Sequence, residues 1–206
     1  MSITTYAELK TAIASWLNRD DLTSVIPDFI ALTEAALNRD LRHLQMIDRD
    51  NATLDTRFVQ LPNDHLETVR LGITSGSTHR LELVSLDAML TQRENSGNTS
   101  GRPKQYAHIG NQIELFPTPD GDYTAQLTYY AKIPALSDSN TSNFVLADAP
   151  DIYLYGALMQ AAPYLLDDAR LQVWGSMYAS ALASMQTSSD NTRNAGSGLR
   201  MRVTSF

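Results

Sequence analysis

The order of the hydrophobic patterns constrains the fold more than any other feature of this sequence. Apolar residues recur at helical spacing in residues 1–47, alternate with polar residues in 48–133, and return to helical spacing in 134–186. We therefore expect an α+β protein, in which the N-terminal and C-terminal helices form one bundle and a small antiparallel β domain is inserted between them. Residues 187–206 have the composition of a linker, and we expect an extended C-terminal tail there.

Two amphipathic helices are expected in the N-terminal segment. The first spans residues 5–18, and Thr5 and Glu8 have the spacing of a capping box, in which each side chain accepts from the backbone amide of the other residue. The second runs over residues 23–45. It has a proline in its first turn, where the missing amide would be unpaired in any case.

Two further helices are expected in the C-terminal segment. One begins at Pro150, and Pro163 inside it predicts a kink or a nearby end, because proline removes a hydrogen bond and clashes with the preceding turn. The other spans residues 167–185. Small residues on both helices allow their backbones to approach closely.

The middle of the chain predicts short strands separated by turns. Gly110-Asn111 is typical of a tight hairpin, and residues 119–122 predict a second turn. A short helix is expected over residues 85–94. The predicted strands are residues 52–56, 58–61, 67–73, 81–84, 106–109, 112–116 and 123–133.

Composition and charge exclude several classes of protein. The 206 residues are 43% hydrophobic and 19% charged, which is typical of a globular chain. The formal charge of −7 disfavours tight binding to nucleic acid, which needs many basic contacts to phosphates. We find no bilayer-length apolar run and no signal-peptide pattern, so we expect no membrane association and synthesis in the cytoplasm.

No group of residues in the sequence suggests catalysis. The chain lacks cysteine, a phosphate-binding glycine loop and a G-x-S-x-G motif. Asp20-Asp21 and Asp167-Asp168 are interpreted as charges at helix starts, where the helix dipole favours them. We expect no catalytic activity, no cofactor and no metal; a small hydrolase with a carboxylate or serine in the β domain is the alternative. The histidines are too widely spaced in sequence for a local metal site: His43, His65, His79 and His108.

Two segments are candidates for contacts with other chains. The loop 95–103 is too polar to order itself by burial, so we expect it to dock on a partner or to stay a free surface loop. The end of the tail alternates apolar and polar residues, which predicts a strand added to a groove or sheet edge, or one folded back on its own subunit. The candidate contact residues of the loop are Asn95, Asn98 and Arg102. Those of the tail are Leu199, Arg200, Met201, Arg202, Val203 and Phe206.

Several short motifs frame the β domain. In the C-terminal half they are residues 129–138, 140–143, 149–158 and 161–165 with Asp168; in the N-terminal half they are 6–9, 16–19, Glu34 and 37–39. Together they resemble the head-to-tail adaptor, connector or neck proteins of tailed bacteriophages. Residues 48–126 show no such motif and resemble that family in architecture alone.

This resemblance implies a structural virion protein and not an enzyme. Such an adaptor forms a homo-oligomeric ring of twelve copies in the neck of the virion, between the portal protein and the tail or nozzle protein. Double-stranded DNA passes through the lumen without specific binding during genome retention and ejection. The tail residues 199–206 would then bind the portal or a neighbouring subunit, and the loop 95–103 would face the phage tail. Another tail or tail-completion protein is the alternative within the same biology.

Overall fold

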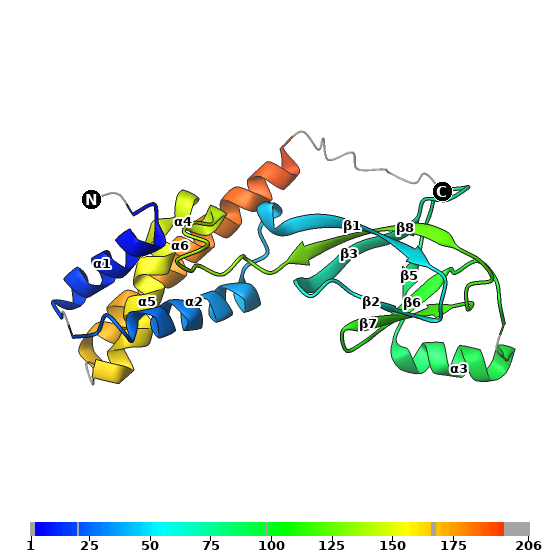
Figure 1. The fold of residues 1–206 in the computed structure, drawn as a ribbon, viewed down its shortest axis with the longest axis horizontal. Coiled ribbons are helices and arrows are strands. Elements are labelled where there is room, and N and C mark those ends of the chain that lie inside the picture. Colours follow the sequence, from blue (N-terminus) through cyan, green and yellow to red (C-terminus); the bar gives the residue numbers. More distant parts are fainter. Residues whose placement is uncertain (1–2, 20, 98, 166–167, 196–206) are drawn as a thin grey trace, which may run out of the picture. The chain divides into compact units, whose positions relative to one another are not determined.

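The chain forms two compact units, one helical and one rich in strands (Figure 1). The computed structural model describes residues 3–19, 21–97, 99–165 and 168–195. The helical unit is drawn from Met1–Gln45 and Ile133–Phe206, and the β unit is Met46–Lys132. The chain leaves the helical unit once and returns to it, which confirms the α+β fold class predicted from the hydrophobic patterns.

The helical unit is built around one central helix, α5 (Pro150–Leu165). It packs against α1 (Tyr6–Leu17), α2 (Ile26–Asp40), α4 (Phe144–Asp148) and α6 (Asp168–Asn194). Apolar and small residues cover nearly its whole surface, so it is buried on several sides. Its buried residues are Ile152, Tyr153, Leu154, Gly156, Ala157, Leu158, Ala161 and Ala162.

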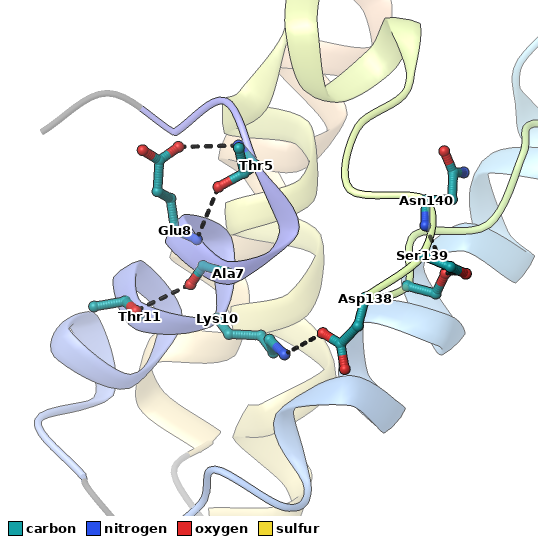
Figure 2. A network of polar contacts seen from close by, with 9 residues as sticks. Thr5, Ala7, Glu8, Lys10, Thr11, Asp138, Ser139 and Asn140 are labelled. Atoms are coloured by element: carbon teal, nitrogen blue, oxygen red, sulfur yellow. Dashed lines mark hydrogen bonds and ion pairs between the residues drawn. The ribbon is translucent and has the colours of Figure 1, made fainter.

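The first helix begins at the predicted capping box. The backbone amide of Glu8 donates to Thr5 Oγ1 at 3.3 Å, and the amide of Thr5 donates to Glu8 Oε2 at 3.0 Å (Figure 2). The second helix is shorter than predicted. It starts at Ile26 and ends at Asp40, and a 3-10 turn over Leu44–Met46 follows it.

The last helix is longer than predicted. Residues 187–194 have a linker-like composition, yet they continue α6, so the expected extended tail is wrong for these residues. Tertiary contacts explain the difference: the buried hydroxyl of Ser189 accepts from the Leu44 amide at 3.0 Å. The Thr187 hydroxyl donates to the Ala183 carbonyl at 2.8 Å, so the helix satisfies its own polar side chains. Helix α5 ends at Leu165, close to Pro163 as predicted.

The β unit contains two four-stranded sheets. The first has the order β1 (Ile47–Leu54), β8 (Tyr123–Ala131), β3 (His65–Ile73) and β4 (His79–Arg80), and all its pairs are antiparallel. The second has the order β2 (Phe58–Gln60), β7 (Gln112–Phe116), β6 (Gln105–Ile109) and β5 (Glu82–Leu83), with β5 parallel to β6. Both sheets contribute to one apolar core, formed by Leu54, Leu61, Leu71, Ile73, Leu81, Tyr106, Ile113, Leu115, Ala125, Leu127 and Tyr129.

The strand predictions hold for the hairpin and fail at two edges. Gly110 has a φ of 59°, which suits the tight turn expected between β6 and β7. Strand β1 begins at Ile47 instead of residue 52, and the predicted strand 81–84 is reduced to Glu82–Leu83.

A buried ion cluster ties helix α3 (Leu86–Ser96) to the second sheet. Glu114 on β7 is only 1% exposed, and its Oε1 lies 2.6 Å from Arg57 Nη2 and 3.1 Å from Arg93 Nε. Arg93 also donates to the Leu115 carbonyl at 2.9 Å. Because a buried carboxylate is stable only when its charge is paired, this cluster fixes α3 on β7.

Helix α5 passes its neighbours most closely at Gly156. A Cβ added there would overlap the methyl group of Thr33 on α2 and would lie 3.2 Å from the ring of Tyr178 on α6. Glycine is therefore required for the close approach of these three helices. Gly175, on α6, has more room: a Cβ there would meet only the sulfur of Met159, at 3.8 Å.

We predict that Gly156→Ala destabilises the helical unit by about 1–3 kcal/mol, because the added methyl forces the helices apart. Gly175→Ala is the matched control, and it should be neutral or stabilising by up to about 1 kcal/mol through its better helix propensity. Urea unfolding followed by far-ultraviolet circular dichroism measures both. Equal stability of the two variants would contradict the close approach at Gly156.

Candidate functional site

The part of the chain that the structure describes offers no cluster of metal-ligating side chains. Over the described residues, no three histidine, aspartate or glutamate side chains lie close enough together to hold a metal ion. Likewise, none of the described helices combines the length and hydropathy of a membrane span.

One of the two carboxylate pairs lies at a helix start as predicted, because Asp168 is the first residue of α6. The other pair does not. Asp21 forms an ion pair with Arg19 at 2.7 Å, and α2 begins only at Ile26. Asp20 and Asp167 lie outside the described residues.

Two histidines that are distant in sequence lie side by side in the β unit. The ring centroids of His65 and His108 are 5.7 Å apart, and His65 also stacks on Tyr129 at 5.5 Å. Burial lowers the pKa of both histidines, and repulsion by the charge of His108 lowers the pKa of His65 further. His65 Nε2 is 2.8 Å from Thr68 Oγ1. The pair is therefore a neutral packing element between the two sheets.

The residues that carry the family resemblance meet where the chain returns to the helical unit. Glu34 Oε1 accepts from the Leu136 amide at 2.7 Å and from the Tyr153 hydroxyl at 3.2 Å. Asn143 Nδ2 donates to the same hydroxyl at 2.7 Å and to the Pro134 carbonyl at 2.9 Å. We call this group the return cluster. It fixes the returning segment against α2 and α5.

Flanking contacts extend the return cluster to the other helices. Asn38 Oδ1, on α2, accepts from the Ile133 amide at 2.8 Å. Lys10, on α1, pairs with Asp138 at 3.1 Å, as Figure 2 shows. The motifs found in the sequence thus hold the returning segment within the helical unit, and their chemistry is that of packing and hydrogen bonding.

Burial changes the acidity of the two central groups of the return cluster. It raises the pKa of Glu34 above its ordinary value, although the hydrogen bonds from Leu136 and Tyr153 act in the opposite direction. Burial also raises the pKa of the Tyr153 hydroxyl. The cluster is stabilised by these donors and has no access to a substrate, because Tyr153 is fully buried.

Helix α6 presents an exposed face without charge. From Leu171 to Ser189 it contains no acidic, basic or histidine residue, a distance of about 28 Å along the helix axis. Trp174 and Tyr178 are buried on its inner side. The exposed positions that share its outer side by helical spacing are Val173, Ser176, Met177, Ser180, Ser184 and Thr187. We call them the neutral face. Sequence reasoning noted the small residues of this helix but did not recognise the missing charges as a surface property.

Large apolar side chains are exposed on the other helices of this unit. Trp16 on α1 is 50% exposed, Leu32 on α2 is 51% exposed and Tyr164 on α5 is 58% exposed. Trp16 packs edge to face on Tyr155 at 6.0 Å, which holds its ring in one orientation. The helical unit therefore carries exposed uncharged side chains on α1, α2 and α5 as well as on the neutral face, where Val173 and Met177 are also exposed.

The candidate loop is ordered by its own unit, which corrects the expectation that it cannot order itself. Asn95 lies in α3, and Arg102 donates to the Ser75 carbonyl at 3.0 Å and to the Ser77 hydroxyl at 2.9 Å. The Gly101 amide donates to the Thr118 carbonyl at 2.8 Å. Hydrogen bonds to backbone groups hold this loop in place without burial. The composition of the loop does not indicate that such bonds form. Asn98 lies outside the described residues, and docking by this loop stays a prediction.

The candidate tail residues also lie outside the described residues. They are Leu199, Arg200, Met201, Arg202, Val203 and Phe206. Their contacts stay a prediction.

Comparison with known proteins gives one family. Residues 4–202 match the model of a family described as SU10 adaptor protein. No curated protein matches the chain. The match includes both helical segments and the β domain, where the sequence showed us no motif, and it confirms the resemblance to phage adaptors.

We predict that Glu34→Gln changes how stability depends on pH. Because the pKa of Glu34 is raised by burial, the folded chain holds this proton more tightly than the unfolded chain does. Its stabilising contribution is present at acid pH and is lost as the pH rises from the ordinary value of 4.5 through the raised pKa. The unaltered chain should therefore lose stability relative to Glu34→Gln as the pH rises above 4.5.

Urea unfolding at several pH values measures this difference. Glu8→Gln is the control, and its effect on the pH dependence of stability should have the opposite sign. The reason is that hydrogen bonds from Thr4 and Thr5 lower the pKa of Glu8. Relative to that variant, the unaltered chain should gain stability as the pH rises. Parallel pH profiles for Glu34→Gln and the unaltered chain would rule out the raised pKa.

Proposed function

Because the chain belongs to the SU10 adaptor protein family, we propose that it forms a ring, of twelve copies, in the neck of a tailed phage between the portal and the tail. The family match carries this proposal. The protein is a phage adaptor of the structural kind, and we propose that it has no catalytic role. In the ring it would join portal and tail mechanically and leave a channel for the genome.

The surfaces of the helical unit support assembly into a ring. A cyclic ring uses heterologous contacts, in which one surface of each subunit meets a different surface of the next. The neutral face offers three serines and a threonine beside Val173 and Met177, and Trp16 and Leu32 offer large apolar side chains on other helices. Large side chains packing against small ones give close contact without burying a charge.

The charge of the chain supports passage of DNA without tight binding. A wall dominated by arginine and lysine would hold a duplex through many phosphate contacts and would oppose ejection. With a formal charge of −7 per copy, the wall facing DNA is neutral or acidic on average in our proposal. Basic contacts would then be few and local.

We predict that Ser180→Glu prevents ring assembly, because a carboxylate on the neutral face would be buried without a partner. Association should weaken by about tenfold or more. Sedimentation velocity of the purified chain, alone and with portal, measures the assembly. Ala88→Glu adds the same charge to the exposed side of α3 and serves as the control. Normal rings from Ser180→Glu would exclude the neutral face as the subunit contact.

We also predict that removing residues 196–206 weakens docking on the portal, or on a neighbouring subunit, by about tenfold or more. Folding should be unaffected, because the cut lies beyond Asn194 and keeps the contact of Ser189 with Leu44. Pull-down on portal and sedimentation measure the two partners separately. A full-length chain with Arg200→Gln and Arg202→Gln tests the contribution of charge. Unchanged affinity for both partners after truncation would reject the tail contact.

A further inference from the structure

The first sheet of the β unit has one face in the core and one exposed face. Leu71, Leu127 and Tyr129 point into the core, so the residues next to them along each strand lie on the opposite side. The register aligns Arg49, Thr128 and Arg70 in one row across β1, β8 and β3. Arginines at both ends of this row are thus about 10 Å apart, two strand spacings.

The next row opens a hollow beside these arginines. Asn51, Gln126, Gly72 and Arg80 are aligned across β1, β8, β3 and β4. Since Gly72 has no side chain, a hollow of about 370 Å³ forms over it. Its lining is Arg49, Val69, Arg70, Gly72, Thr74, Thr78, Gln126 and Thr128. Two guanidinium groups therefore share a hollow with hydroxyl and amide groups, all of which suit phosphate oxygens.

The charges of this face are unusual for the chain. Neither row contains a carboxylate, although the chain has 23 acidic residues against 16 basic ones. Glu67 belongs to the following row, opposite Tyr130, and Asp48 lies on the other face, opposite Tyr129. Arg49 and Arg70 are exposed, and across the described residues neither side chain has a hydrogen bond or ion pair.

We propose that this face contacts the phosphate backbone of double-stranded DNA through Arg49 and Arg70. An acidic protein partner fits less well, because stable protein interfaces have apolar anchors at their centre and the hollow has only Val69. Arginine, threonine and glutamine are residues that commonly contact phosphates without reading sequence. This inference deepens the proposed function, since the duplex passing the ring would be the ligand. Two arginines per copy allow a weak contact that salt screens.

The test is binding of a labelled 30-base-pair duplex of arbitrary sequence to the full chain, followed by fluorescence anisotropy between 20 and 150 mM salt. The unaltered chain should bind at low salt and lose affinity as salt rises. The double variant Arg49→Gln, Arg70→Gln should weaken binding about tenfold and reduce the slope of log affinity against log salt by about 2. Each single variant should reduce that slope by about 1.

A control variant removes the same charge from other surfaces. Arg39→Gln with Lys104→Gln takes away two exposed basic residues outside this face, and its binding should match that of the unaltered chain. Equal losses in the two double variants would overturn the proposal, as would absence of binding at 20 mM salt. Displacement of the duplex by polyglutamate at equal charge would also overturn it, in favour of an acidic protein.

Sedimentation separates this inference from the proposed function. The Arg49, Arg70 double variant should assemble like the unaltered chain, because both residues belong to the β unit and the neutral face belongs to the helical unit. Loss of DNA binding with normal rings supports the site. If neither the unaltered chain nor any variant forms rings, the proposed ring is rejected. The DNA site is still supported in that case if binding depends on the two arginines.

Discussion

The buried carboxylate of Glu34 joins parts of the helical unit that are far apart in the sequence. One oxygen receives the backbone amide of Leu136, in the segment that returns from the β unit, and the hydroxyl of Tyr153 on the central helix α5. A carboxylate at this depth has lost its water, so only these donors compensate for its burial. The arrangement of α2, α5 and the returning segment therefore depends on this group. Asn143, which bonds the same hydroxyl, also caps α4 by accepting from the Leu146 amide at 3.0 Å.

The two units use their polar groups differently on their surfaces. In the helical unit, charge is absent from the exposed side of α6 between Leu171 and Ser189, and an uncharged exposed surface of this length favours association with another chain. In the β unit, Arg49 and Arg70 remain exposed on a sheet face that lacks apolar anchors. The first kind of surface suits a permanent contact between proteins, and the second suits a weak contact with a polyanion. Both kinds of surface would serve the ring proposed above, which has to stay assembled while DNA moves through it.

Much of the fold and of the site could be predicted from local patterns. The capping box of Thr5 and Glu8, the hairpin at Gly110 and the succession of helical, strand-rich and helical segments depend on neighbouring residues, and the structure agrees with them. The return cluster could be predicted only in part. Its residues belong to the motifs that resemble phage adaptors, but the bond between Glu34 and Tyr153 joins residues far apart in the chain. Nothing in local spacing indicates which polar residues become partners across such a distance.

The sequence by itself determined the fold class, the family and the absence of a local catalytic motif, because periodicity, turn residues and short motifs are properties of neighbouring residues. Only the tertiary structure decided where α6 ends and how the loop 95–103 is held. In both places polar residues that resemble linker are ordered by hydrogen bonds to distant partners: Ser189 to Leu44, and Arg102 to Ser75. It also decided that Arg49 and Arg70 share one row, since strand register brings them together across Thr128. Composition gives the number of hydrogen-bond donors and acceptors, but only the tertiary structure determines which of them form bonds with each other.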